Sequence, residues 1–218
     1  MLATILPEHR QLFFDNGYIE FEKLFSLDRI RTLEIALEKE ICKKLDYPEK
    51  FAHHIPAVEQ YKEGYDLWRN NDTVRTMTRN KLIGNIMLDL LKERELFLAY
   101  DMIINNCAPQ SNETVSLQDI SSIDGMAGAA IICIREDRGD LPTPNWLPKK
   151  IGDVTFIKDD YELEENLQHD GRYFLLGYAR KPLIYHYNEK NAHNHALQKM
   201  GYDFGDVLSE ATHPRIKL

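Results

Sequence analysis

Three of the eight histidines, His186, His193 and His195, lie close together in the sequence and could bind a metal ion. Neutral imidazoles bind Zn²⁺ and Fe²⁺, and two histidines spaced by one residue share a face when the segment is a strand. His169 could take the place of His186 in such a site. No paired cysteine or carboxylate motif accompanies the cluster, so an exposed polar loop is the simpler interpretation. A divalent-metal-responsive regulator is the functional alternative.

Carboxylates offer a second arrangement of possible ligands. Asp119 or Asp124, together with Glu162, would form an all-oxygen site. Such a site suits Mg²⁺, Ca²⁺ or Mn²⁺ better than catalytic Fe(II). The simpler interpretation is that these side chains are solvated at strand ends or in loops.

Composition and charge limit the classes of partner. Of the 218 residues, 43% are apolar and 28% are charged, which is typical of a globular protein and not of a disordered one. The formal net charge of −8 opposes binding to nucleic acid and to anionic membranes, because both attract an excess of Lys and Arg. We therefore expect neither nucleic acid nor a membrane as the partner, which leaves a small molecule or a protein.

The three cysteines, Cys42, Cys107 and Cys133, have no paired spacing. A disulfide framework is therefore not expected, and a reducing cytoplasm is the predicted location. No secretory signal is evident at the N-terminus, and no apolar run reaches the ~20 residues that span a bilayer.

Periodicity predicts helices first and strands afterwards. Gly17 is suited to end a helix, and Ser26 is suited to begin one as its N-cap. The predicted helices run from Pro7 to Gly17, from Ser26 to before Pro48, from Val58 to Trp68 and from Asp72 to about Lys92. The predicted strands are Tyr18–Phe21, Leu96–Ile104, Ala129–Ile134, Val154–Ile157, Tyr173–Ala179 and Leu183–Tyr187. This order favours the α+β class over an alternating βαβ array.

Four parts of the sequence, Arg10–Phe21, Leu67–Ile104, Gly152–Phe156 and Arg172–Ala179, share one resemblance. They resemble the phytanoyl-CoA dioxygenase-like proteins, a group of Fe(II)/2-oxoglutarate oxygenases, and the opening block also has a looser likeness to uncharacterised chlamydial proteins. The resemblance implies a double-stranded β-helix, or jelly roll, with N-terminal helices packed on one sheet. It implies one domain over 1–218, with helical support to about 92, jelly-roll strands over about 95–187 and C-terminal helices and tail over 188–218.

The resemblance also implies Fe(II), held by a His-x-Asp pair and a second His, and 2-oxoglutarate, held by Arg172. The chain contains no His-x-Asp, and no histidine lies between residues 55 and 168. The segment Leu117–Gly125 and Glu162 occupy the corresponding positions. Non-standard metal ligands would have to come from Asp119, Asp124, Glu162, His169 or His186.

These observations lead to one main hypothesis about function. We expect an oxygenase-like fold that has lost iron chemistry and binds a ligand or partner, with Arg172 as the residue that captures a small carboxylate. The alternatives are a 2-oxoglutarate-dependent oxygenase with non-standard metal ligands and the metal-responsive regulator described above.

Overall fold

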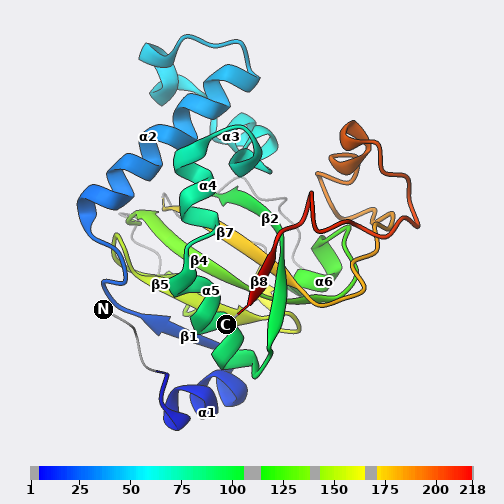
Figure 1. Ribbon diagram of the computed structural model, residues 1–218. Coiled ribbons are helices and arrows are strands. Elements are labelled where there is room, and N and C mark those ends of the chain that lie inside the picture. The colour runs from blue at the N-terminus through cyan, green and yellow to red at the C-terminus, as the bar shows by residue number, and fades with distance from the viewer. Residues whose placement is uncertain (1–4, 106–113, 138–142, 165–170, 218) are drawn as a thin grey trace.

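An antiparallel sheet of six strands, in the order β1-β5-β4-β7-β2-β8, forms the centre of the computed structural model (Figure 1). The structure describes residues 5–105, 114–137, 143–164 and 171–217. The strands of this sheet are β1 (Tyr18–Phe21), β2 (Glu95–Ile104), β4 (Met126–Arg135), β5 (Val154–Lys158), β7 (Arg172–Ala179) and β8 (Arg215–Lys217). A second, two-stranded sheet pairs β3 (Thr114–Val115) with β6 (Leu163–Glu164).

The helices precede most of the strands and lie largely on one side of the six-stranded sheet (Figure 1). The α-helices are α1 (Pro7–Asn16), α2 (Leu27–Lys44), α3 (Ala57–Glu63), α4 (Asp72–Thr78), α5 (Lys81–Leu91) and α6 (Leu117–Ile120). The 3-10 helices are η1 (Glu49–His54), η2 (Leu67–Arg69) and η3 (Leu197–Met200). Among the described residues, no helix is long and apolar enough to cross a membrane.

Local sequence signals fixed the first elements correctly. Gly17 ends α1 in the left-handed conformation, and its N–H donates to the carbonyl of Phe13. The Ser26 hydroxyl accepts the N–H of Arg29 at the start of α2. Strand β1 has the predicted bounds.

Three other segments differ from the sequence predictions. The single helix predicted from Asp72 to about Lys92 is wrong, because Asn80 accepts the N–H of Leu82 and starts a separate helix, α5. The segment Leu183–Tyr187, predicted as a strand, forms only isolated bridges. The C-terminal tail, predicted to be polar and partly helical, instead adds strand β8 to the edge of the sheet beside β2.

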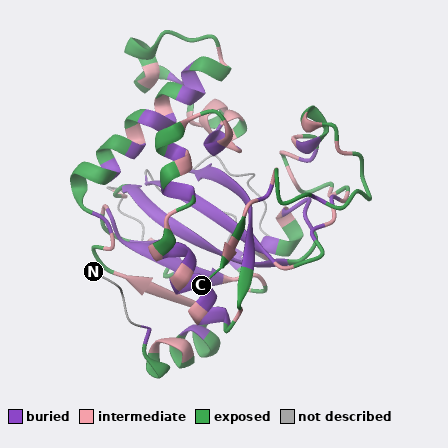
Figure 2. Ribbon diagram, viewed as in Figure 1, coloured by how far each residue is buried: buried purple, intermediate pink, exposed green. Residues whose placement is uncertain are grey.

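The two faces of the six-stranded sheet bury different cores, and Figure 2 shows its central strands buried along their length. The outer face packs against the helices through side chains such as Phe174 and Leu176 of β7. The inner face carries Tyr173 and Leu175, the alternate residues of the same strand. This alternation decides which β7 side chains could reach a site on the inner face.

The α+β class predicted from the sequence is confirmed. Helices and an antiparallel sheet are segregated as expected. Besides the six-stranded sheet, the described residues form one further sheet, of the two strands β3 and β6.

Gly152 makes a close backbone contact between the start of α2 and the start of β5. Its φ is +88°, and a Cβ added there would lie 2.3 Å from the carbonyl oxygen of Phe25. The added Cβ would clash with backbone atoms, which can move apart only at a cost in free energy. We therefore expect Gly152→Ala to lower the free energy of unfolding by about 2–4 kcal/mol. Denaturant unfolding measures this effect.

Gly205 provides the matched control for Gly152. Its φ is +98°, but a Cβ there would meet no atom within 4 Å. Gly205→Ala should therefore cost only the conformational strain of about 1 kcal/mol. Equal losses for the two variants would show that the contact with Phe25 is not the cause.

Candidate functional site

The pairing of β3 with β6 brings together the two segments that the sequence assigned to the metal site. Val115 lies opposite Leu163, so the segment before Asp119 runs beside the segment that contains Glu162. The buried core on this inner side is mainly apolar. It includes Ile104, Val115, Leu117, Ile131, Cys133, Trp146, Leu163 and Tyr173.

The Cys133 thiol, on the inner face of β4, is not a candidate nucleophile. Burial, with a smaller effect of the carboxylates of Glu136 and Asp153, raises its pKa to about 12. A thiol with this pKa stays protonated and unreactive at neutral pH.

Asp119 is engaged in capping the short helix α6. Its carboxylate accepts hydrogen bonds from the backbone N–H and the hydroxyl of Ser116, both at 2.8 Å. These two bonds hold the pKa of Asp119 below its usual value. The neighbouring Gln118 donates its side-chain amide to Asp159 at 2.7 Å. Both side chains therefore have structural partners, and Glu162 is exposed.

Asp124 and His186 form a close pair, but at the other end of the sheet. The Asp124 Oδ1 lies 3.1 Å from Nδ1 of His186. Asp124 precedes Met126, which pairs with Ala179 at the end of β7 opposite Arg172. Arg172 and Ala179 are the two ends of this eight-residue strand and lie seven residue steps, or about 23 Å, apart. Asp124 and His186 therefore share no site with Arg172.

Arg172 points toward helix α2 from the outer face of β7. Its Nη1 donates to Oε1 of Glu38 at 2.9 Å and lies 3.8 Å from Glu34, and its side chain is only 5% exposed. An external carboxylate could bind Nη1 only by displacing Glu38, and Nε is buried without a hydrogen-bond partner among the described residues. The role predicted for Arg172 in binding 2-oxoglutarate has no support in this arrangement and stays a prediction.

The three clustered histidines point to different partners. The His193 ring stacks on Tyr65, with ring centroids 4.4 Å apart, whereas His195 Nδ1 lies 3.0 Å from Gln198. His186 contacts Asp124, as described above. His169 lies outside the described residues. Within the described ranges, no group of three His, Cys, Asp or Glu side chains is placed to hold a metal ion.

His193 makes stability depend on acid pH. Burial, and secondarily the charge of Lys44, lowers its pKa to about 4. Because an unfolded histidine titrates near 6.5, protons favour the unfolded chain as the pH falls below 6.5. We expect this residue to lower the free energy of unfolding by about 2 kcal/mol between pH 6.5 and pH 5.

Denaturant unfolding from pH 7.5 to pH 5 checks this prediction. Relative to wild type, His193→Gln should gain about 2 kcal/mol in free energy of unfolding as the pH falls from 6.5 to 5, whereas His195→Gln, at an exposed position, should follow the wild-type profile. The same pH profile in both variants would contradict the prediction.

Solved structures with low sequence identity align with nearly the whole chain. The non-heme alpha-ketoglutarate-dependent carbocyclase SnoK, from nogalamycin biosynthesis, aligns with a TM-score of 0.69 at 11% identity, over 99% of this chain and 98% of SnoK. The corresponding epimerase SnoN aligns with a TM-score of 0.63 at 14% identity, over 97% of this chain and 98% of SnoN. Alpha-ketoglutarate is 2-oxoglutarate. This chain has the fold of the 2-oxoglutarate-dependent non-heme iron enzymes.

The fold is all that these comparisons show. The protein CT296 from Chlamydia trachomatis aligns with a TM-score of 0.50 at 14% identity, over 83% of this chain and 99% of CT296. No protein-family profile and no curated protein sequence matches the chain.

The described residues do not fit the iron site of the 2-oxoglutarate-dependent fold. That site needs two imidazoles and one carboxylate on one face of the metal. Here the segment around β3 and β6 offers Asp119, which caps α6, and the exposed Glu162. Among the described residues, the one close histidine–carboxylate pair, His186 with Asp124, lies at the far end of the sheet.

Proposed function

We propose that this protein keeps the fold of the 2-oxoglutarate-dependent iron enzymes, has lost iron-dependent catalysis, and acts by binding a ligand or a partner. A fold of this kind does not need the metal to stay folded, because its sheet is held by backbone hydrogen bonds and by two buried cores. Loss of the metal ligands would therefore leave the scaffold intact.

The arrangement of Arg172 is the observation that carries this proposal. In the resemblance drawn from the sequence, this residue should bind 2-oxoglutarate on the inner side of the sheet. Instead its buried guanidinium is held by Glu38 on the helical side. A buried cation paired in this way serves the packing of α2 on the sheet.

We further propose that β3 and β6 represent the second sheet of a degenerate jelly roll. They pair antiparallel, and their buried side chains Val115 and Leu163 join the core on the inner face. The chain would then be a degenerate member of the oxygenase superfamily, in which apolar packing replaces the metal ligands.

Calorimetric titration with 2-oxoglutarate tests the proposal. Wild type and Arg172→Gln are each titrated in the presence and in the absence of Mn²⁺, which resembles Fe²⁺ in its ligand preferences but resists oxidation. We expect no saturable, Mn²⁺-dependent heat from either protein. Mn²⁺-dependent binding by wild type that is lost in Arg172→Gln would overturn the proposal.

A further inference from the structure

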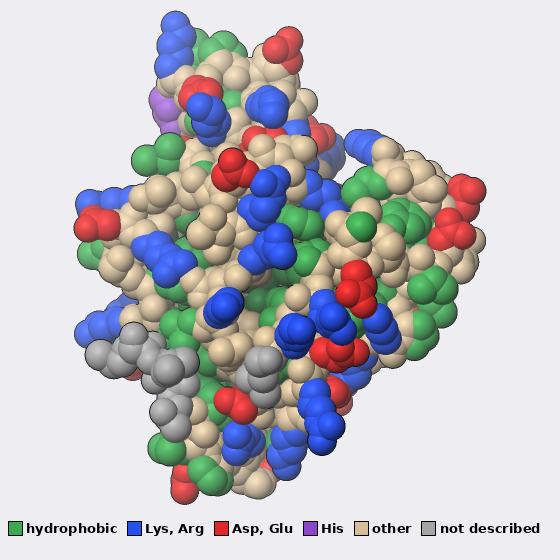
Figure 3. Space-filling model, viewed as in Figure 1, with side chains coloured by type: hydrophobic (Ala, Val, Ile, Leu, Met, Phe, Trp, Pro, Cys, Tyr) green, Lys and Arg blue, Asp and Glu red, His purple; other side chains and the backbone are tan. Residues whose placement is uncertain are grey.

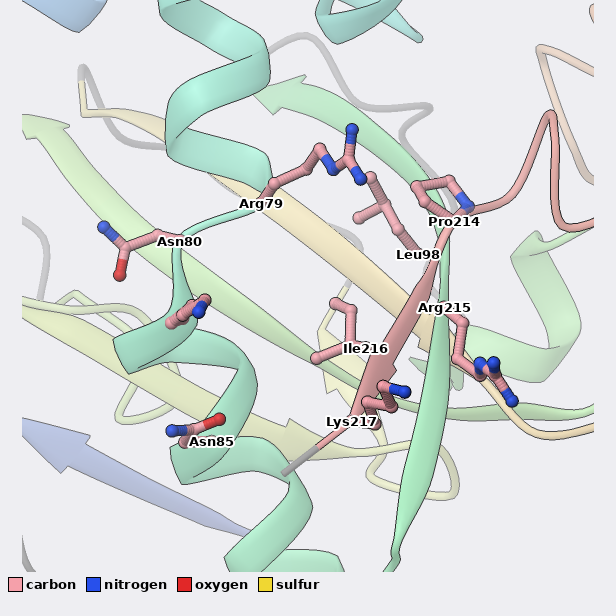
Figure 4. Close-up of a pocket in the computed structure, with 9 residues that line it drawn as sticks. Arg79, Asn80, Asn85, Leu98, Pro214, Arg215, Ile216 and Lys217 are labelled. Atoms are coloured by element: carbon pink, nitrogen blue, oxygen red, sulfur yellow. The ribbon is translucent and has the colours of Figure 1, made fainter.

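A pocket of about 450 Å³ lies between the α4–α5 junction and strand β8 (Figure 4). It is on the helical side of the molecule, and Leu98 in its wall belongs to the outer core. Pro214 and Ile216 extend this apolar wall. Its volume lies in the range of small-molecule sites. The pocket is separate from the segments that were considered as iron ligands, so the loss of iron binding does not affect it.

Four cationic side chains surround the opening of this pocket. They are Arg79, Lys81, Arg215 and Lys217. They come from the end of α4, the start of α5 and strand β8. Figure 4 shows Arg79 extending from α4 toward Leu98 and Pro214. The positive charges therefore approach the pocket from different directions.

Only one of the four cations has an acidic partner among the described residues. Arg215 lies 3.3 Å from Glu95 and 3.7 Å from Glu210. Arg79, Lys81 and Lys217 form no ion pair within the described part of the chain. Three cations that form no ion pair with described residues stand out at one pocket of a protein whose net charge is −8, although the charge of Lys217 also helps to lower the pKa of Glu210.

The molecular surface shows the same concentration of charge. In Figure 3, Lys and Arg side chains gather around a hydrophobic hollow over α5 and β8. The amide side chains of Asn80 and Asn85 also line the pocket. Asn80 Oδ1 already accepts the N–H of Leu82, but the Asn85 amide can donate to a bound anion.

We propose that this pocket binds a small organic phosphate. A phosphate dianion has oxygens that accept hydrogen bonds from several sides, which matches cations placed on three separate elements, whereas a carboxylate accepts in one plane. The positive end of α5 adds to the attraction. The wall formed by Leu98, Pro214 and Ile216 would contact the organic part of the ligand.

Isothermal titration with glycerol 3-phosphate, inorganic phosphate and glycerol tests this assignment. We expect saturable binding of glycerol 3-phosphate, weaker binding of inorganic phosphate and none of glycerol. In the double variant Arg79→Gln/Lys217→Gln we expect the Kd for glycerol 3-phosphate to rise at least about tenfold, because two charged donors are lost. Both side chains are exposed, so the fold should not change, and the thermal unfolding midpoint verifies this.

The double variant Lys39→Gln/Lys62→Gln is the control. It removes the same charge from exposed positions that do not line the pocket. Unchanged affinity in this control supports a specific site. The proposal is overturned if glycerol 3-phosphate does not bind saturably, or if both double variants weaken binding equally. Equal affinity for inorganic phosphate and glycerol 3-phosphate would overturn the role of the apolar wall.

Discussion

Replacing Arg172 by glutamine should lower the free energy of unfolding by about 2–3 kcal/mol. The variant removes a buried cation and leaves the carboxylates of Glu38 and Glu34 facing each other without it. Breaking a fully buried pair costs about 3–5 kcal/mol, and the partial exposure of the two glutamates reduces that cost. Denaturant unfolding at pH 7 gives the value.

Arg135 offers a matched comparison on the neighbouring strand. It pairs with Arg172 across β4 and β7 and lies 2.7 Å from the same Glu34, but its side chain is 55% exposed. Arg135→Gln should therefore cost less than about 1 kcal/mol. If Arg172→Gln were no more costly than Arg135→Gln, the structural role assigned to Arg172 would be wrong.

Asp101 is expected to make a larger contribution than His193 to the dependence of stability on pH between 4 and 7, and in the opposite direction. Its buried carboxyl accepts the backbone N–H groups of Leu67 and Trp68, both at 3.0 Å. Burial, and then the charge of Asp66, raises its pKa to about 7. Since an unfolded aspartate titrates near 4, the stability present below pH 4 is lost as the pH rises to 7, by up to about 4 kcal/mol.

Asp101→Asn should remove this loss, because an amide does not ionise. The difference in free energy of unfolding, variant minus wild type, should therefore increase as the pH rises from 4 to 7. This holds even if the variant is less stable than wild type at every pH. Asp119→Asn is the control. Ser116 lowers the pKa of this exposed carboxyl, so the contribution of Asp119 to the free energy of unfolding is lost as the pH falls, which is the opposite direction to Asp101. Parallel pH profiles for wild type and Asp101→Asn would contradict the assignment.

Elements with local signals could be predicted from the sequence. The left-handed Gly17 and the Ser26 cap fix the ends of α1 and α2 without help from distant residues. The segments that form β1, β2, β4, β5 and β7 were recognised as well, since β-branched and aromatic residues concentrate in them, whereas Leu183–Tyr187 was predicted wrongly and β8 was missed. Their order was enough to give the α+β class.

The face occupied by Arg172 could not be predicted. Strand β7 is buried on both sides, so its residues show no alternation of apolar and polar types that would reveal which face is which. A shift of one residue would have exchanged Arg172 with Tyr173. Only the register against β4, together with the glutamates of α2, places the guanidinium on the helical side.

The pocket between the α4–α5 junction and β8 could not be predicted from the sequence either, because it depends on contacts between distant segments. Arg79 and Lys217 are 138 positions apart, and they meet because β8 pairs with the start of β2. The cap at Asn80 contributes by turning the chain between α4 and α5. The net charge of −8, on which the sequence argument rested, does not reveal positive charges that are assembled from three elements.

Iron content after anaerobic loading is the most direct test of the central claim. The protein is incubated with Fe(II) and 2-oxoglutarate without oxygen, desalted, analysed for iron per chain, and then exposed to oxygen while succinate is measured. We predict less than about one-tenth of an iron per chain and no succinate above the level without protein, since the described ligands do not fit the iron site. One iron per chain together with succinate formation would contradict the account.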